Sequence, residues 1–516
     1  MALSNLGDDL EKKSGGRSLG LKSWDLTLSR AEVVEEIERT ASRLRAECEC
    51  GTRVVSVLGK NSGRTLITYL ATMLSGAALV PLNAHLQASE IAHMILESES
   101  GLLIVDPVLL EVALAAARNA PDVRVVSWTE VSGVGYITLN EWLDGPSVAE
   151  QSTVRVSPPI LFSSGTTGRP KRTLMPRTIF PRGATLAEYR TWAAGNRFVG
   201  QGPHLVSGPL NHSGPIQATA LLASGVPVHI PRRFDPTEIL ETIEAERIAS
   251  TLMVPTHFVR LLRAQSESSR EYDVSSMRLV TQTGAGCPEE TKRQMIDWWG
   301  EIFFETYGGT ESGGVCAITS AEWLDRPNSV GRPVPGVRVL VIDDTGAEVP
   351  TGAEGRLYFE NATGFGIEYE DAPELTAAAH LRPGVFTLGE IGRVDNDGYV
   401  YLTDRDSDKI VSGGVNIYPA EAERVLAEHP AVVDVAVIGI DNDEMGEEAL
   451  ALVVPAADRL PSADLASELV SFCRTELSAV KTPRQVRFVE AIERTAMGKL
   501  NRRELRRAFV ATKELA

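Results

Sequence analysis

Apolar runs and amphipathic segments alternate along the first two-thirds of the chain. Residues 53–58 and 102–105 are rich in Val, Ile and Leu, which is typical of strands buried on both faces. Residues 66–74 instead carry apolar side chains at helical spacing. The same reading predicts further strands at 78–81, 226–230 and 250–254, and further helices at 90–98, 236–246 and 258–264. Strands that alternate with helices predict parallel sheets covered by helices, and therefore an α/β fold.

The pattern changes at about Gly331. Short strands at 337–342, 355–360 and 399–403, separated by turns, predict a small antiparallel β unit. Beyond Arg405 the chain predicts a compact α+β unit, with helices at 420–428 and 462–477, strands at 432–440, 449–454 and 485–488, and a basic C-terminal helix. The short polar segment from Asp404 to Ser407 has the character of a hinge. We therefore expect a large N-terminal domain at residues 1–404 and a small, mobile C-terminal domain at residues 405–516.

Length, charge and cysteine content narrow the class of protein. A chain of 516 residues is too long for one core, and its 43% hydrophobic and 23% charged residues are typical of a soluble globular protein. The net charge of −18 argues against nucleic acid as a partner. Five scattered cysteines favour reduced thiols, and neither the polar N-terminus nor the interrupted apolar stretch 65–89 suits a signal peptide or a membrane span. These features predict a cytoplasmic location without an integral membrane segment.

A loop rich in hydroxyl groups and glycine is the most informative segment. It contains Ser163, Ser164, Gly165, Thr166, Thr167 and Gly168, and Lys171 closes it. Because glycine lets backbone N–H groups approach a ligand closely, and the hydroxyls and lysine add donors, the loop can surround a polyphosphate. Pro170 distinguishes it from the common phosphate loop, which leads into a helix. An ordinary Ser/Thr/Gly surface loop is the alternative interpretation.

A second motif consists of Tyr307, Gly308, Gly309, Thr310 and Glu311. It follows an apolar run at 302–304 that we expect to be a strand. The aromatic ring can lie against a purine, the glycines allow close backbone approach, and the carboxylate can hold Mg²⁺ against phosphates. A strand followed by a plain glycine turn is the alternative. Its position downstream of the phosphate loop favours a nucleotide site.

The two motifs together resemble those of the adenylate-forming superfamily, in its acyl-CoA synthetase branch, and the resemblance covers nearly the whole chain. It implies an adenine-contacting turn at Gly284, Ala285 and Gly286, and Mg²⁺ ligation by Glu311 and Thr166. Further segments match residue by residue. They imply that His212 borders the acyl pocket and the pantetheine channel, that Glu390 and Arg405 meet the ribose and phosphate, that Gly413 and Gly414 line the thiol channel, and that Lys499 is a catalytic lysine.

The resemblance also implies a two-step reaction that uses ATP or acyl-AMP, Mg²⁺ and coenzyme A. A small-molecule carboxylic acid first attacks the α-phosphate of ATP, giving acyl-AMP and pyrophosphate, and a thiol then displaces AMP. Lys499 would stabilise the charge that develops in the first step. Rotation of the C-terminal domain about the hinge would then replace Lys499 in the cleft by Gly413 and Gly414.

Several residues depart from the family pattern. Glu390 stands where an aspartate is usual, and Arg172, Asn211, Ser407 and Glu493 also differ from the common residues. The departures leave four functions open. These are a complete acyl-CoA synthetase, an enzyme for the thioester half-reaction alone that relies on a partner adenylating enzyme, an enzyme that loads a carrier protein, and a non-catalytic nucleotide-binding protein.

The acyl substrate is predicted from small residues near the cleft. Asn211 and the small residues Ser213, Gly214, Gly284 and Gly308 are expected to leave a wide pocket. Such a pocket would suit a bulky alicyclic, aryl, terpenoid or steroid-like acid better than a slim fatty acid.

Overall fold

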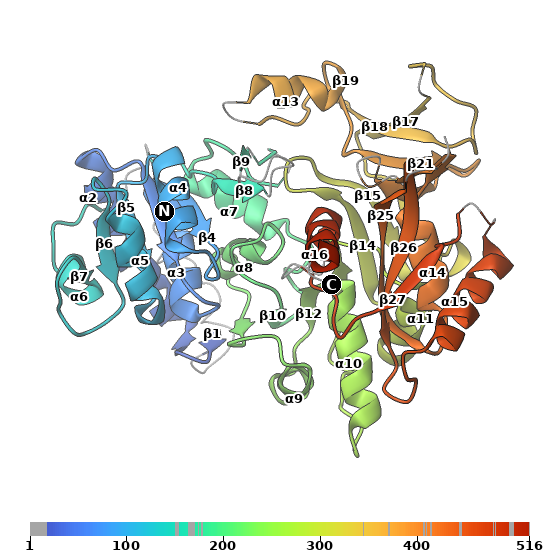
Figure 1. Cartoon of the computed structure of the whole chain (residues 1–516). Helices are drawn as coiled ribbons and strands as arrows, with labels where there is room; N and C mark the ends of the chain where they lie inside the picture. Colours follow the sequence, from blue (N-terminus) through green and yellow to red (C-terminus); the bar gives the residue numbers. More distant parts are fainter. Residues whose placement is uncertain are drawn as a thin grey trace.

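The computed structural model confirms the α/β architecture, with a large N-terminal part of parallel sheets and a small C-terminal part (Figure 1). It describes residues 18–149, 154–163, 171–173, 175–176, 179–343, 345–369, 372–405, 408, 410–412, 415–442, 446–477, 479, 481–494 and 500–514. The N-terminal helices and strands lie at the left of the view and most elements of the C-terminal part at the right, whereas α16 lies near the middle.

Parallel strands form the core of the largest sheet. In spatial order these are β1 (Leu19–Ser23), β11 (Val228–Ile230), β10 (His204–Val206), β12 (Ser250–Met253), β13 (Leu279–Gln282) and β14 (Phe303–Gly309). The edge strand β2 (Thr27–Ser29) runs antiparallel to β1. Strands β10, β11 and β12 are buried throughout. Inside the sheet, polar residues of β10 and β12 pair with each other, as where Nδ1 of His204 lies 3.0 Å from the hydroxyl of Ser250. One face is covered by α9 (Pro236–Glu246), α10 (Pro255–Glu267) and α11 (Glu289–Trp299).

A second parallel sheet packs beside the first. Its strands, in spatial order, are β4 (Ala78–Leu82), β3 (Val54–Leu58), β5 (Leu102–Val105), β6 (Arg124–Ser127) and β7 (Ile137–Thr138). Helices α2 (Arg30–Glu49), α3 (Gly63–Ser75) and α8 (Ala218–Ala223) share one core with both sheets, whereas α4 (Ala88–Glu97) and α5 (Leu110–Ala117) cover the outer face. Helix α3 is buried on almost every side, which is why its sequence is apolar all round.

The antiparallel β unit expected from Gly331 onward is not a separate sheet. Strand β15 (Gly313–Thr319) turns back on β14, and β16 (Ser329–Pro333) joins β15 to β22 (Val400–Arg405). The large sheet therefore continues into the predicted unit, through β21 (Glu390–Val394), β18 (Gly355–Asn361), β17 (Val337–Ile342), β20 (Val385–Phe386) and β19 (His380–Arg382). The alternation of residues predicted the strands but not their partners, because an apolar pattern does not specify which edge a strand pairs with.

The C-terminal part is the α+β unit that the sequence predicts. Its elements are β23 (Ile410–Ser412), β24 (Val415–Ile417), α14 (Pro419–Ala427), β25 (Val432–Asn442), β26 (Gly446–Pro455), α15 (Ala463–Glu476), β27 (Gln485–Phe488) and α16 (Arg502–Glu514). Helices α14 and α15 cover one face of the sheet, and Leu505 and Phe509 of α16 pack on the other. The predicted boundary between residues 404 and 405 falls at the end of β22 and stays a prediction.

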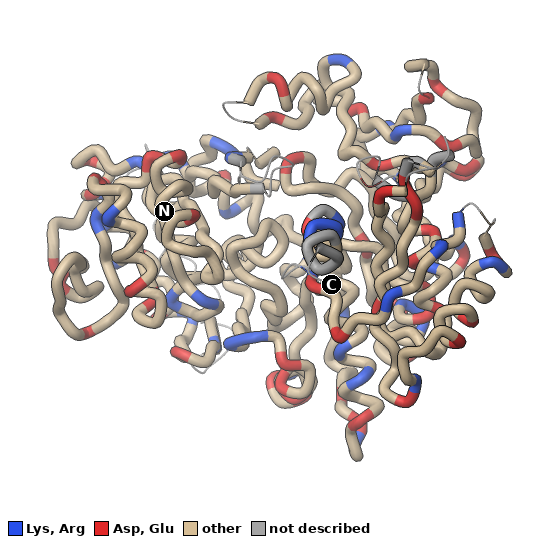
Figure 2. The backbone as a smooth tube through the Cα atoms, viewed as in Figure 1, with Lys and Arg blue, Asp and Glu red and all other residues tan. Residues whose placement is uncertain are grey.

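Charged residues of both signs are interspersed over the whole molecule (Figure 2). Basic residues gather on α16, where Arg506 pairs with Asp441 and Glu447 of the neighbouring strands. In the part of the chain that the structure describes, no helix combines the length and apolar character needed to cross a membrane.

Candidate active site

The predicted phosphate loop spans the tip of a hairpin. Strands β8 (Leu161–Ser163) and β9 (Lys171–Thr173) are antiparallel, and Ser163 is paired with Lys171. Lys171 therefore begins a strand and not a helix, as Pro170 predicted. The residues between them, Ser164, Gly165, Thr166, Thr167 and Gly168 among them, lie outside the described residues.

The sequence predicted that the Tyr307 motif follows a strand. In the structure most of the motif lies within one. Strand β14 runs on to Gly309, so Tyr307, Gly308 and Gly309 belong to it, and only Thr310 and Glu311 of the motif lie in the turn to β15. The two glycines allow β14 and β15 to pair very closely. A Cβ atom on Gly308 would lie 1.9 Å from the carbonyl oxygen of Gly313, which no side chain tolerates.

Glu390 meets the ring of Tyr307 across the cleft. The Oη of Tyr307 donates a hydrogen bond of 2.7 Å to Oε2 of Glu390. Glu390 is only 6% exposed. Strand pairing sets the backbone of Arg405 opposite Glu390. Three residues predicted to serve the nucleotide thus come together from β14, β21 and β22. The extra methylene of Glu390, relative to aspartate, lengthens its reach toward the phenol.

Glu311 is held by a tyrosine that the sequence did not point to. The Oη of Tyr369 donates to Oε1 of Glu311 at 3.2 Å. Burial raises the pKa of the Tyr369 phenol, and the negative charge of Glu311 adds to the effect. The phenol therefore stays protonated and remains a donor.

His212 lies in a turn that is fixed from a different sheet. Asn61, just after β3, donates to the carbonyl of Gly208 at 2.9 Å and accepts from the backbone N–H of Leu210 at 2.9 Å. Next to His212, the hydroxyl of Ser213 lies 3.0 Å from that of Thr310. The predicted acyl-pocket segment and the Tyr307 motif are therefore in direct contact.

The predicted adenine turn connects β13 to α11. Gly284 adopts a φ of +92°, a conformation that favours glycine, and Ala285 and Gly286 follow it. The hydroxyl of Thr283 donates to the carbonyl oxygen of Thr306 at 3.1 Å, which ties this turn to β14. Behind the turn, a buried ion pair between Lys292 and Glu305 joins α11 to the same strand. Burial raises the pKa of the Glu305 carboxyl, and Lys292 opposes this shift.

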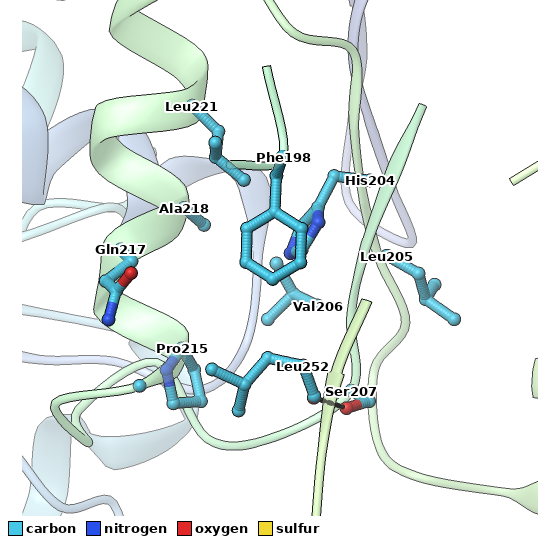
Figure 3. Close-up of a pocket in the computed structure, with 11 residues that line it drawn as sticks. Phe198, His204, Leu205, Val206, Ser207, Pro215, Gln217, Ala218, Leu221 and Leu252 are labelled. Carbon is cyan, nitrogen blue, oxygen red and sulfur yellow. Dashed lines mark hydrogen bonds between the residues drawn. The ribbon is translucent and has the colours of Figure 1, made fainter. Parts of the chain in front are cut away.

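A small cavity lies between strand β10 and helix α8 (Figure 3). On one side it is lined by Gly214, Pro215, Gln217, Ala218 and Leu221, and on the other by Phe198, Leu252 and strand β10. Its volume is about 10 Å³, roughly the space of one water molecule. Of the small residues named for a wide pocket, only Gly214 lines it. The wide acyl pocket that the sequence predicts therefore stays a prediction.

The remaining predicted residues lie on the C-terminal part. Gly413, Gly414 and Lys499 are outside the described residues. The strands that flank Gly413 and Gly414 in sequence, β23 and β24, pair antiparallel, and α16 begins at Arg502, soon after Lys499 in sequence. Arg502 donates to Asp408 and to Glu423, each at 2.6 Å, so the helix after the predicted lysine is tied to the region of the hinge.

The residues present fit a divalent cation that arrives with its own ligands. No group of three or more His, Cys, Asp or Glu side chains that could hold a metal occurs in the described part of the chain. Mg²⁺ usually takes one or two protein carboxylates and completes its shell with phosphate oxygens and water. Glu311 offers one such carboxylate beside the phosphate-loop hairpin.

Family models match both parts of the chain. Residues 22–366 match the model described as AMP-binding enzyme, and residues 421–499 match the AMP-binding enzyme C-terminal domain. The chain belongs to the AMP-binding enzyme family. This AMP-binding enzyme is an AMP-forming acid–thiol ligase of the acyl-CoA synthetase branch, and it uses ATP with Mg²⁺ and coenzyme A.

Relatives of this AMP-binding enzyme align over nearly their whole length. It is 30% identical over 485 residues to the indoleacetate–CoA ligase of Aromatoleum aromaticum, covering 93% of this chain and 92% of that protein. It is 32% identical over 521 residues to the feruloyl-CoA synthase of an Amycolatopsis species, covering 96% and 100%. Among solved structures, ATP-bound MatB from Rhodopseudomonas palustris superposes with a TM-score of 0.79 at 26% identity, covering 99% of each chain.

Sequence reasoning missed Asn61 and Tyr369 in this AMP-binding enzyme. Asn61 carried a usable signal, since polar residues at the carboxyl ends of parallel strands often face ligand sites. Tyr369 carried none, because 58 residues separate it from Glu311 and its local sequence has no motif of its own.

Proposed function

We propose that the protein is a complete acyl-CoA synthetase, which performs both half-reactions on a carboxylic acid with an aryl ring. The observation that carries the proposal is the hydrogen bond between Tyr307 and Glu390. Glu390 was the departure that most favoured a loss of adenylation. Because its carboxylate is held beside the aromatic ring of the nucleotide motif, we expect the substitution to alter the ribose contact without removing it.

In the first half-reaction the substrate carboxylate would attack the α-phosphorus of ATP, and the bond to pyrophosphate would break. Lys499 would stabilise the negative charge that develops on the α-phosphate. The donors of the phosphate loop and Lys171 would hold the polyphosphate. Mg²⁺, bound through Glu311 and Thr166, would neutralise phosphate charge.

In the second half-reaction the thiol of coenzyme A would attack the acyl carbonyl and AMP would leave. Gly413 and Gly414 would leave room for the pantetheine arm, and His212 would border its channel. Movement of residues 405–516 about the hinge between the two steps is part of this proposal.

The aryl preference rests on the relatives named above. Both act on aromatic acids by name, an indole acid and a feruloyl acid. We therefore favour an aryl acid over an alicyclic, terpenoid or steroid-like acid, and place the enzyme in the cytoplasm.

Two alternatives differ in what the cell must supply. A thioester-only enzyme would need a partner adenylating enzyme, and a carrier-protein ligase would need a protein thiol. The contacts of Glu311 and Glu390 on the nucleotide side support the complete enzyme over the first. The coenzyme A ligase names of the two relatives support it over the second.

A paired assay tests the proposal. Purified protein with Mg²⁺ and coenzyme A receives free acids and ATP in one reaction, and the corresponding synthetic acyl-adenylates in the other. The acid panel contains ferulate, indoleacetate, palmitate and a steroid-like acid. We expect acyl-CoA and pyrophosphate in the first reaction, with an aryl acid preferred. Acyl-CoA from acyl-adenylates alone would instead establish the thioester-only enzyme.

A further inference from the structure

Tyr369 connects three segments around the phosphate side of the cleft. Its backbone forms an isolated antiparallel bridge with Thr173, two residues beyond Lys171. Its N–H donates to the hydroxyl of Thr376 in α13 (Pro373–Ala378) at 3.0 Å, and that hydroxyl lies 3.3 Å from its carbonyl oxygen. Its ring packs on the core formed by the strands around β18. The phenol is therefore held at a fixed place beside Glu311.

The carboxylate of Glu311 is bound on one oxygen only. Oε1 accepts from Tyr369, whereas Oε2 faces Gly309, where a Cβ atom would lie 3.0 Å from it. Within the described part of the chain, no lysine or arginine forms an ion pair with Glu311, and no second hydrogen bond reaches it. Carboxylates away from solvent are usually neutralised by a cation. A neutral donor that fixes one oxygen leaves the negative charge of the carboxylate in place for such a cation.

We propose that Tyr369 is a positioning residue that orients the Glu311 carboxylate for the divalent cation brought by ATP. This inference rests on the proposed role of Glu311. Mg²⁺ demands near-ideal octahedral geometry, so a carboxylate that rotates freely binds it poorly. The bridge to Thr173 couples that orientation to the strand that closes the phosphate loop. Residues that hold a metal ligand in place commonly change metal affinity about 10- to 100-fold when replaced.

The test compares Tyr369→Phe with a matched control. Tyr401→Phe removes the same atom from an equivalent pair, because Tyr401 Oη also donates at 3.2 Å to a carboxylate, that of Asp395, outside the cleft. Mn²⁺, a paramagnetic stand-in for Mg²⁺, is titrated by electron paramagnetic resonance in the presence of a non-hydrolysable ATP analogue. We expect Tyr369→Phe to weaken Mn²⁺ binding about tenfold, and Tyr401→Phe to leave it at the parent value. In Tyr369→Phe the KM for Mg²⁺ should also rise more than the KM for the acid.

Three outcomes distinguish failure of the positioning role of Tyr369 from failure of the proposed role of Glu311. Glu311→Gln is titrated in parallel and should lose Mn²⁺ binding further than Tyr369→Phe. Parent-like Mn²⁺ binding in Tyr369→Phe, with a loss in Glu311→Gln, would overturn the positioning role alone. Unchanged binding in both would overturn the role of Glu311 itself. Equal losses in Tyr369→Phe and Tyr401→Phe, accompanied by equal falls in melting temperature, would show a structural effect and also overturn the inference.

Discussion

Acidic residues in the cleft and in the C-terminal part are satisfied in different ways. In the cleft, Glu311 and Glu390 accept hydrogen bonds from the phenols of Tyr369 and Tyr307. In the C-terminal part, Asp408 and Glu423 share Arg502, and Asp434 pairs with Arg494. A phenol holds a carboxylate in place and leaves its negative charge. An arginine holds the carboxylate in place and also neutralises that charge.

The difference separates a binding role from a structural one. Among the described residues no lysine or arginine pairs with Glu311, so its charge can serve the proposed cation. Charge that is cancelled in the C-terminal part fixes α16 on its sheet, and with it the segment that follows Lys499. The contrast predicts that cleft variants change ligand binding with little effect on folding, and that C-terminal variants do the reverse.

The largest effect is expected for Glu311→Gln. Loss of the charge should lower the rate of pyrophosphate formation by about 10²- to 10³-fold, a size typical for removal of one group that stabilises transition-state charge. The melting temperature should stay near that of the parent. Asp395→Asn, which alters the analogous pair with Tyr401, is the control and should not slow adenylation. If the melting temperature of Glu311→Gln fell in step with its activity, the role of Glu311 would be structural, and the contrast between the cleft and the C-terminal part would be wrong.

Arg502→Met should show the opposite behaviour. Arg502 is 16% exposed and loses two ion-pair partners when it is replaced. Leaving Asp408 and Glu423 partly buried without their cation should destabilise the C-terminal part by about 2–3 kcal/mol. Calorimetry should report the change as a lower melting temperature, while Mn²⁺ binding with the ATP analogue stays unchanged.

Arg507→Met serves as the control for Arg502. It lies on the same helix but its side chain is 63% exposed and pairs only with Glu504, so its loss should change stability by less than about 0.5 kcal/mol. If both variants lowered the free energy of unfolding by a comparable amount, the partly buried ion pairs of Arg502 would stabilise the protein no more than the exposed pair of Arg507.

A smaller effect is expected for Tyr307→Phe. Removal of the phenol takes one charge-assisted hydrogen bond from Glu390, worth about 1–2 kcal/mol, so the KM for ATP should rise about five- to thirtyfold. Steady-state kinetics at saturating acid measure this directly, and kcat should change less. Tyr399→Phe, whose Oη lies 3.4 Å from Glu322 outside the cleft, is the matched control. Equal KM values for parent and Tyr307→Phe would exclude a role of the Glu390 contact in nucleotide binding.

A further effect concerns pH, because the two regions also hold histidines beside different partners. His204 lies beside the neutral hydroxyl of Ser250, whereas His429 lies beside the carboxylate of Glu468. Burial lowers the pKa of His204 to about 3, with a further contribution from His229. The unfolded chain therefore binds this proton first as the pH falls below about 6.5, so stability is full above that pH and declines below it by about 1.4 kcal/mol per unit.

His204→Gln removes that titration and keeps a polar partner for Ser250. Melting temperatures recorded between pH 8 and pH 4.5 should fall less steeply for the variant than for the parent, with the curves differing only below about pH 6.5. Parallel curves over the whole range would show that His204 does not contribute to the acid sensitivity.

Local patterns predicted most elements of the fold. Helix α9 and strands β17 and β27 begin and end at the predicted residues, because proline, glycine and charged residues mark those boundaries locally. The motifs around Lys171 and Tyr307 predicted the nucleotide site for the same reason, since each is a continuous segment. What the patterns did not predict was pairing: β16 pairs with both β15 and β22 and so continues the large sheet into the antiparallel strands, and β14 extends through the Tyr307 motif.

The sequence by itself determined which chemical groups this enzyme possesses and the order in which its helices and strands occur. The tertiary structure decided which groups meet. Tyr369 reaches Glu311 across 58 residues, and Tyr307 reaches Glu390 across 83. Such contacts follow from strand register and helix packing over long distances along the chain, and no local periodicity encodes them. The positions of Glu311 and Glu390, on which the proposed cation and ribose binding depend, are therefore a property of the assembled sheet.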